Sequence, residues 1–404
     1  MTNESKKILV TSTTFPRWED DTTPRFVYDL SKNLASKYSI IALAPHYKGA
    51  LKREKTGNLN VRRFSYFKPE SMQKLAYDGG IIPNMRKSFL AKMQMPLLIS
   101  AEFFNACKII KKEKINLIHA HWTLPQGFVG VFLKKKFRIP LLVTVHGSDL
   151  FPLKSKLLKK LQNFVFKNAD HITVNSIATK NELLSRFPRY NYKLSTIPMG
   201  IDTRIFKKIR IKKPNNYKNN KILLFVGRLS DQKCIQYLIE SLKYLYYEFP
   251  QIKLLIIGEG PYEKELKWIT NKNKLNNYVD FLGPIPFSEL AKYYNFADIF
   301  ILPSLSTNTG TEALGLTIIE AMASGCAVIG ANVGGIRYLV KNMDNGILVN
   351  EKDPIGLAKA IKTLLKNKKL AIKLGKNAAY FARKDYSWDK ITKDFAKIYD
   401  NLLK

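Results

Sequence analysis

The chain has 404 residues, of which 46% are hydrophobic and 12% aromatic, so it has enough apolar material for two domains and is not mainly disordered. Lys and Arg number 67 and Asp and Glu 32, which gives a formal net charge of +35. Three explanations of this charge stay open. The composition of the chain is biased toward Lys, Asn and Ile, or the chain binds nucleic acid, or it contacts an anionic membrane surface. Because no recognisable nucleic-acid module accompanies the charge, we expect no nucleic-acid partner.

The cysteines and the apolar runs indicate in which cellular compartment the protein is expected. Cys107, Cys234 and Cys326 stand singly, without the spacing of a disulfide framework or a zinc site, which favours a reducing, cytoplasmic setting. An early strand over Ile8–Thr13 leaves no room for a signal peptide, and no apolar run is long enough for a transmembrane helix. We expect a cytoplasmic protein, with peripheral contact at the inner face of the cell membrane as an open alternative.

The first half of the chain alternates between strand and helix patterns. The strand at Ile8–Thr13 is followed by the loop TTFPRWEDDTTPRF, and then by helical spacing over Phe26–Leu34 and a second strand over Ile40–Pro45. This alternation predicts α/β architecture with a parallel sheet.

Two further strand ends in this half carry histidines. They are LIHAHWTLPQG from Leu117 and LLVTVHGSD from Leu141. Since His119 and His121 alternate along one strand, we expect them to point to opposite faces of the sheet. A metal site built on this pair is therefore not favoured, and no third ligand is evident.

The stretch Met72–Lys114 mixes Met, Phe, Leu and Ile with Lys and Arg. Such a mixture is typical of an amphipathic segment at a membrane interface. It is equally typical of a basic-faced helix that packs on its own domain, and the sequence leaves both interpretations open.

The second half of the chain is separated by a basic, Asn-rich stretch. We expect a first domain over residues 1–204, a linker over 205–220 and a second domain over 221–385. Apolar residues at helical intervals predict a final helix over 386–404.

A buried strand opens the second domain. Ile222–Val226 is an uninterrupted apolar run, as expected of a parallel strand covered on both faces, and Gly227 and Arg228 follow it directly. Lys233 lies five residues further on. An Arg fork and a mobile Lys charge beside a glycine turn are suited to a pyrophosphate group.

A second strand–loop–helix unit carries two carboxylates. The strand Ile299–Leu302 ends at a proline and a polar loop, and Glu312 and Glu320 follow with seven residues between them. The helix that starts in this interval directs its first N–H groups, at about Gly315–Thr317, beyond the end of the strand, where they favour a phosphate. Two acids beside an anion site suggest a nucleotide-sugar, whose hydroxyls flank its pyrophosphate.

Each of these signals also has an ordinary explanation. Glutamates on an amphipathic helix usually face solvent, and single Lys or Arg residues in so basic a chain are usually surface charges. The combination of the signals favours the ligand site.

Together, the motifs GRLSDQK, LLIIGEGP, VDFLGPI, E-x7-E with EAMASGCAVI, and DNGILV resemble the carboxyl-terminal domain of retaining glycosyltransferases of the group 1 (family 4) type. The resemblance is nearly continuous from about Lys221 to Val349. It implies the GT-B fold, in which two Rossmann-like domains face each other across a cleft, the first on the acceptor side, with the final helix crossing back to it.

The resemblance also implies a function. A UDP- or GDP-sugar would be the donor, and a hydroxyl of a cell-envelope polysaccharide, a glycan or a lipid-linked acceptor would receive the sugar with retention of configuration. No cofactor and no metal would be required, because fixed cations and N–H groups would stabilise the leaving phosphate.

The site residues follow from the matched motifs. By resemblance, His146 lies beside the reacting sugar, Glu312 accepts from sugar hydroxyls and Glu320 accepts from the ribose. The backbone near Gly283 and Ile285 would meet the base. The groups expected at the phosphates are Gly227, Arg228, Lys233, Gly315, Leu316 and Thr317.

Some positions depart from the family pattern. The first loop lacks the usual Gly-Gly pair, so its phosphate contact is open, with Arg25 as a candidate. Met199, Cys234 and Arg337 replace an asparagine, a glycine and a glutamate that are common in the family. Two alternative functions stay open: a GT-B nucleotide-sugar epimerase, and a non-catalytic basic protein that binds membrane or nucleic acid.

Overall fold

The computed structural model describes residues 5–307 and 310–404. The chain divides into two compact units, residues 1–199 with 391–404, and residues 200–390. The stretch 205–220 is counted with the second unit. It is fastened there, since Ile209 donates its N–H to the Asn295 side chain at 2.8 Å.

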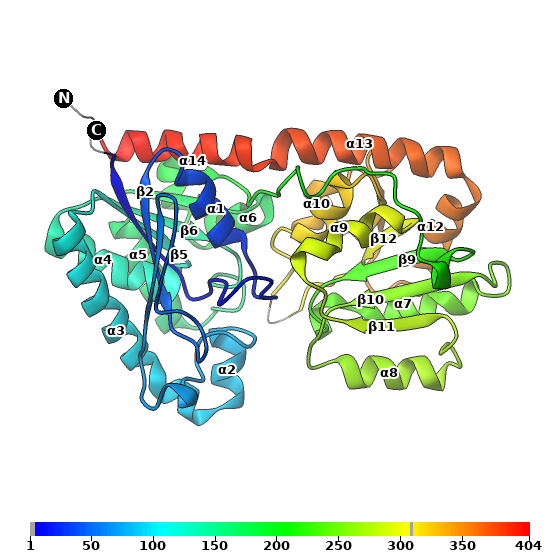
Figure 1. Ribbon diagram of the computed structural model, residues 1–404, viewed down its shortest axis with the longest axis horizontal. Helices are drawn as coiled ribbons and strands as arrows, with labels where there is room; N and C mark the ends of the chain where they lie inside the picture. The colour runs from blue at the N-terminus through cyan, green and yellow to red at the C-terminus, as the bar shows by residue number, and fades with distance from the viewer. Residues whose placement is uncertain (1–4, 308–309) are drawn as a thin grey trace. The chain divides into compact units, whose positions relative to one another are not determined.

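The first unit is built on an eight-stranded sheet with the order β3-β4-β2-β1-β5-β6-β7-β8 (Figure 1). All neighbouring strands are parallel except β3 and β4, which are antiparallel. The strands are β1 (Lys7–Thr11), β2 (Ser39–Pro45), β3 (Arg53–Thr56), β4 (Leu59–Phe64), β5 (Leu117–His121), β6 (Leu141–Val145), β7 (His171–Val174) and β8 (Leu194–Thr196).

Helices cover both faces of this sheet, with α1 and α14 on one side and α3, α4 and α5 on the other (Figure 1). Ser88 and Ser155 cap α3 and α5 by accepting N–H groups of the first turn. The helices are α1 (Phe26–Leu34), α2 (Ile81–Lys87), α3 (Phe89–Glu113), α4 (Phe128–Phe137), α5 (Lys156–Asn168) and α6 (Ile177–Arg186). The last helix, α14 (Trp388–Leu402), belongs to this unit from Ile391 on.

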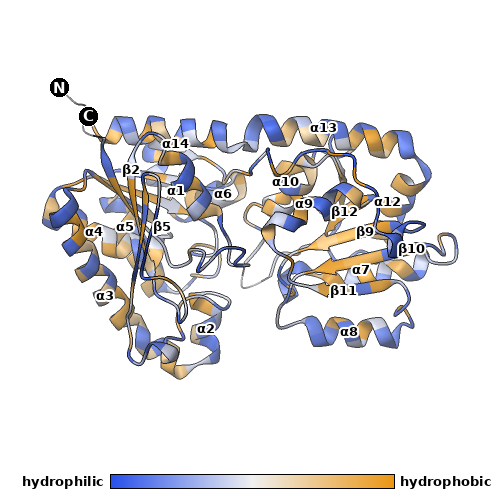
Figure 2. Cartoon of the chain, viewed as in Figure 1, coloured by the Kyte–Doolittle hydropathy of each residue, from blue (hydrophilic) through white to orange (hydrophobic). Residues whose placement is uncertain are grey.

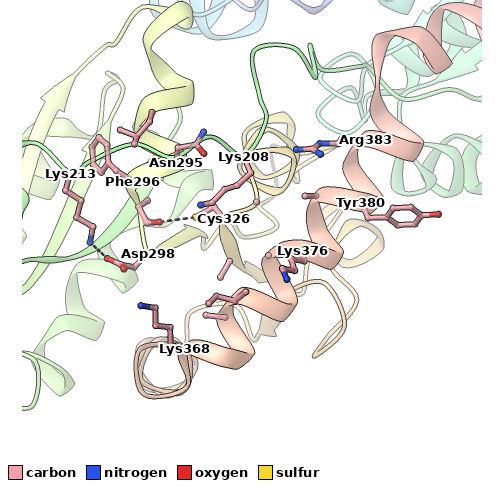
Figure 3. Close-up of a pocket in the computed structure, with 18 of the residues that line it drawn as sticks. Lys208, Lys213, Asn295, Phe296, Asp298, Cys326, Lys368, Lys376, Tyr380 and Arg383 are labelled. Carbon is pink, nitrogen blue, oxygen red and sulfur yellow. Dashed lines mark hydrogen bonds and ion pairs between the residues drawn. The ribbon is translucent and has the colours of Figure 1, made fainter.

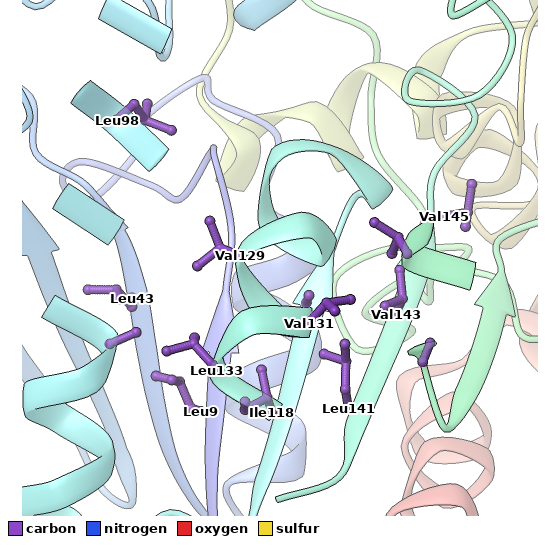
Figure 4. Close-up of a cluster of buried hydrophobic side chains, with 14 of the residues drawn as sticks. Leu9, Leu43, Leu98, Ile118, Val129, Val131, Leu133, Leu141, Val143 and Val145 are labelled. Carbon is purple, nitrogen blue, oxygen red and sulfur yellow. The ribbon is translucent and has the colours of Figure 1, made fainter. Parts of the chain in front are cut away.

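The core of the first unit lies between the sheet and helices α3 and α4 (Figure 4). Leu9, Ile118 and Leu141 project from adjacent parallel strands, and each is 0% exposed. Val131 and Leu133 from α4 are equally buried. This packing holds β5 and β6 in place, and these are the strands whose carboxyl ends carry the histidines.

The second unit has a six-stranded parallel sheet with the order β11-β10-β9-β12-β13-β14. Figure 2 shows β9, β10 and β11 in predominantly hydrophobic colours. The chain runs outward from β9 to β11 and then returns to place β12 on the other side of β9. The strands are β9 (Lys221–Val226), β10 (Ile252–Ile257), β11 (Val279–Gly283), β12 (Ile299–Leu302), β13 (Ala327–Ala331) and β14 (Ile347–Val349).

Helices α9, α10 and α13 cover one face of this sheet and α7, α8 and α12 the other (Figure 1). The final helix predicted over 386–404 corresponds to α14, which follows α13 after the extended Ser387. Nothing among the described helices is both long and apolar enough to cross a membrane. The helices are α7 (Ile235–Ser241), α8 (Glu263–Lys272), α9 (Phe287–Phe296), α10 (Leu316–Ala323), α11 (Ile336–Leu339), α12 (Pro354–Lys366) and α13 (Lys368–Tyr386).

Candidate active site

The candidate site of the second unit lies where the strand order reverses, at the carboxyl ends of β9 and β12. In open α/β sheets this is the position where ligands bind. The loops after these two strands are joined, because Leu305 donates its N–H to the Gln232 carbonyl at 2.9 Å. The predicted cation and carboxylate motifs are thus parts of one structure.

Lys233 and Glu312 contact each other in this structure. The Lys233 ammonium donates to the Glu312 carboxylate, which also accepts from the Ser304 hydroxyl at 3.2 Å. Both charged side chains are largely buried, at 17% and 14% exposed. Neither is an ordinary solvated surface charge, the alternative that the sequence had left open.

The glycine turn after β10 supports the first loop by close backbone contact. A Cβ atom at Gly258 would lie 2.0 Å from the Gly227 carbonyl oxygen, and one at Gly260 would lie 2.2 Å from that of Leu229. The Leu229 N–H also donates to the Glu259 carbonyl at 2.9 Å. The G-x-G pattern therefore positions the loop that carries Arg228.

A second glycine pair, after β13, supports the other loop. Gly335 donates its N–H to the Glu312 carbonyl at 2.7 Å, and a Cβ at Gly334 would lie 2.2 Å from that oxygen. The backbone at Glu312 is held by this contact. Its carboxylate is directed by Lys233 and Ser304.

Glu320 lies on α10 and is buried, at 9% exposed. It accepts a hydrogen bond from the Tyr294 hydroxyl at 2.8 Å. Burial, and after it the nearby charge of Glu320, raises the pKa of Tyr294 well above its usual range, so this tyrosine stays a donor. The idea that this glutamate faces solvent is wrong.

Helix α10 begins directly after Gly315, whose φ of 87° is in the region that favours glycine. The N–H groups of Ile318 and Ile319 already bond to the Gly315 carbonyl. Leu316 and Thr317 are half-buried in the first turn of the helix. Their N–H groups belong to the amino terminus of α10, as predicted.

The remaining predicted positions of this unit are less closely joined. Arg228 is exposed on the first loop, and Ile285 is half-buried beyond the end of β11. The Gly283 carbonyl accepts the Gly258 N–H at 2.8 Å, so one of its lone pairs is already used. Cys234 has φ 50°, which explains why glycine is common there in the family.

His146 lies in the first unit, at the carboxyl end of β6. Its Nε2 lies 2.9 Å from Nδ1 of His121, and the two rings stack. Burial lowers the pKa of His146 to about 3, so its ring is neutral near pH 7. Phe26 and Trp122 pack against the ring with centroids 4.9 and 4.8 Å away.

The expectation that His119 and His121 point to opposite faces is wrong. Their ring centroids are 4.2 Å apart, because residues two apart on a strand share a face. His119 bonds to the Tyr399 hydroxyl of α14 at 2.7 Å and to the Thr144 hydroxyl at 2.6 Å. We call His119, His121 and His146 the histidine cluster. Within residues 5–307 and 310–404, no three His, Cys, Asp or Glu side chains form a group that could hold a metal ion.

Two family models match the chain. The one described as Glycosyl transferases group 1 matches residues 206–381, and the one described as Glycosyltransferase Family 4 matches residues 23–205. An uncharacterized glycosyltransferase of Methanocaldococcus jannaschii is 31% identical over 295 residues, which is 73% of this chain and 78% of the relative. The chain belongs to the group 1 glycosyltransferases.

The group 1 glycosyltransferase is also similar to a D-inositol 3-phosphate glycosyltransferase of Corynebacterium glutamicum, with 27% identity over 338 residues, 78% of this chain and 79% of the relative. Sucrose-phosphate synthase from Thermosynechococcus elongatus superposes with a TM-score of 0.79 at 23% identity, covering 98% of this chain and 99% of the other. Anabaena HepE in complex with UDP-glucose superposes with a TM-score of 0.74 at 19% identity, with the same coverage. The expected GT-B fold is confirmed, and the chain is a transferase.

Asp149 is a residue of this glycosyltransferase that sequence reasoning missed. It is buried and accepts from the N–H groups of His146, at 2.9 Å, and Thr123, at 2.5 Å, which ties the ends of β5 and β6 together. Burial raises its pKa. The signal was present, since an Asp three residues after a histidine can accept that residue's own N–H.

A pocket of about 860 Å³ in the second unit of the glycosyltransferase lies away from this site (Figure 3). It is lined at the amino ends of β12 and β13, by residues such as Asp298 and Cys326, and by Lys376 and Arg383 of α13. Lys208 and Lys213 complete a basic rim. The parallel strands place it at the edge opposite to Lys233 and Glu312, so it is not the predicted donor site.

Proposed function

We propose that this chain is a retaining, metal-independent glycosyltransferase that moves a sugar from a nucleotide-sugar to a hydroxyl of a polysaccharide, glycan or lipid-linked acceptor. The observation that carries the proposal is the contact among Lys233, Glu312 and Ser304 at the strand reversal of the second unit. It brings a cation for a diphosphate and an acceptor for sugar hydroxyls to one point.

Donor binding would rearrange this contact. A diphosphate would attract the Lys233 ammonium, and Glu312 would be released to accept from hydroxyls of the sugar. Arg228 and the N–H groups at Leu316 and Thr317 would add donors on the phosphate side. The Lys233–Glu312 pair thus keeps both groups in place until the donor arrives.

Leaving-group chemistry follows from the same groups. Negative charge grows on the departing phosphate, and preorganised cations and N–H groups stabilise it without reorganisation. The acceptor hydroxyl would attack from the face that the nucleotide leaves, which retains the anomeric configuration. His146, neutral because of its burial, would serve as a hydrogen-bonding partner of the sugar rather than as a cation.

The donor that we propose is a UDP-sugar. HepE, whose fold is similar, is described with UDP-glucose and with UDP and glucose. The test is a panel of UDP-, GDP- and ADP-sugars, with nuclear magnetic resonance of the anomeric proton of the product. Transfer from UDP-sugars with retained configuration is expected, and an inverted product contradicts the proposal. Epimerisation of the donor's sugar without any acceptor would favour an epimerase instead.

We also propose peripheral contact between the first unit and an anionic membrane. Phe89, Met93 and Leu97 form a stripe on α3 at four-residue spacing and are 76%, 59% and 44% exposed. Lys92 and Arg86 are exposed next to it. Apolar side chains with adjacent cations are the features of an interfacial helix.

Vesicle sedimentation tests this contact. Wild-type protein is expected to bind vesicles of phosphatidylcholine with phosphatidylglycerol, and less so at high salt. Phe89→Ser combined with Met93→Ser should weaken binding, whereas Tyr247→Ser, which alters an equally exposed side chain (85%) in the second unit, should not. Binding that ignores both salt and lipid charge contradicts the proposal.

A further inference from the structure

An exposed tryptophan lies at the carboxyl edge of the first sheet. Trp18 belongs to the loop that follows β1, and Tyr47 belongs to the loop that follows the adjacent parallel strand β2. His146 follows β6 of the same sheet, so all three loops emerge at one edge. Ligands of open α/β sheets bind along this edge.

The loop that carries Trp18 is held by Arg17. The guanidinium lies 4.5 Å from the ring centroids of both Trp18 and Tyr47, and these two rings contact each other edge to face with centroids 6.2 Å apart. It also bonds to both carboxylate oxygens of Asp21, at 2.9 and 2.7 Å. Asp21 is 3% exposed. A buried ion pair and three cation–π contacts, the third to Tyr77 at 5.6 Å, thus fix the loop.

Trp18 itself remains 47% exposed. Arg17 and Tyr47 both contact the indole, so the exposed area is the part of the ring that these two side chains leave uncovered. A large aromatic face that is both open and held in place loses little conformational entropy when a ligand covers it. These are properties of a binding surface.

Two exposed carboxylates accompany this loop in a chain that is otherwise strongly basic. Glu19 follows Trp18 directly, and the Asp78 side chain, 62% exposed, accepts from the Tyr47 hydroxyl at 3.2 Å and from the Arg17 guanidinium at 3.4 Å. Carboxylates accept hydrogen bonds from sugar hydroxyls and repel phosphates. An apolar aromatic face with acceptors at its rim matches a neutral sugar ring, which has C–H faces and hydroxyl edges.

We propose that Trp18 is a stacking platform for a sugar ring of the acceptor, with Glu19 and Asp78 as acceptors for its hydroxyls. The acceptor is then a neutral saccharide at this position, not a phosphate-rich headgroup. This inference rests on the proposed function, since it assigns part of the acceptor of the same reaction.

The test uses the full-length Trp18→Ala and Trp18→Phe variants. Trp268→Ala is the matched control, because Trp268 is 55% exposed in the second unit and also carries a cation, Lys272, 4.7 Å from its ring centroid. With maltotriose, cellotriose and chitotriose as acceptor probes, Trp18→Ala should raise the acceptor KM about tenfold, a factor expected from the loss of one stacked ring. Trp18→Phe should recover part of this loss.

Hydrolysis of the donor without acceptor separates the two proposals. Trp268→Ala should leave this hydrolysis unchanged. Quenching of tryptophan fluorescence by the same trisaccharides should disappear in Trp18→Phe and persist in Trp268→Ala, and this readout needs no turnover. If no donor is consumed but the quenching depends on Trp18, the proposed function fails and the platform stands.

Three results would overturn the platform. They are an unchanged acceptor KM in Trp18→Ala, the absence of any quenching that depends on Trp18, and a loss of vesicle binding in place of saccharide binding. Thermal unfolding of the variants must match the wild type, and Trp18→Phe provides the folded comparison if Trp18→Ala does not.

Discussion

The Lys233–Glu312 pair predicts opposite effects of its two members on UDP binding. Lys233 must leave Glu312 before it can contact a diphosphate, so Glu312 competes with the ligand. With both side chains largely buried, we take the net strength of the pair as about 1 kcal/mol, the upper end for partly exposed ion pairs. Glu312→Gln should therefore bind UDP about fivefold more tightly, while it loses sugar transfer.

Lys233→Ala removes a charged donor from the diphosphate. Such a hydrogen bond contributes about 2 kcal/mol, so UDP should bind about thirtyfold more weakly. Isothermal titration calorimetry with UDP measures both variants. Lys267→Ala is the control, because it breaks a Lys–Glu pair (Lys267 with Glu263, 2.7 Å) on the exposed surface of α8. Weaker UDP binding by Glu312→Gln, or UDP binding by Lys233→Ala equal to that of the control, would show that Glu312 and the diphosphate do not compete for Lys233.

Three further predictions concern the support of the site. Gly258→Ala should lower the free energy of unfolding by about 1–3 kcal/mol and raise the donor KM, because the new Cβ meets the Gly227 carbonyl. Gly49→Ala is the control, because Gly49 has φ 89° and no atom nearby, so that this change affects stability through backbone strain alone. Equal destabilisation of the two variants in urea melts would contradict the clash at Gly258. Tyr294→Phe should cost about 1–3 kcal/mol in the same melts and weaken donor binding, because it removes the hydrogen bond that the Tyr294 hydroxyl donates to buried Glu320. Burial lowers the pKa values of the histidine cluster, so the unfolded chain binds more protons than the folded chain below about pH 6.5. The free energy of unfolding should therefore fall as the pH drops from about 6.5 toward 3. A urea midpoint that does not change between pH 7 and 5 would show that the cluster is not buried as a neutral group.

Elements with strong local signals could be predicted from the sequence. Ile299–Leu302 and Phe26–Leu34 agree with β12 and α1 in their bounds, since uninterrupted apolar runs and helical spacing are local properties. The Lys233 and Glu312 motifs could be placed at one site because parallel strands bring their carboxyl ends to one edge. Their direct contact could not, since it depends on how two loops fold against each other.

Other features depended on contacts between distant residues. The sequence gives no sign that Gly258 lies against the Gly227 carbonyl or that Tyr294 donates to Glu320. His119 and His121 share a face because side chains alternate along a strand, so that residues two apart point the same way.

A crystal structure with UDP would locate the nucleotide. We expect the diphosphate between Lys233, Arg228 and the first turn of α10, with the ribose at Glu320 and Glu312 turned away from Lys233. A diphosphate bound instead in the basic pocket beside Lys208 and Arg383, at the opposite edge of the sheet, would contradict this expectation.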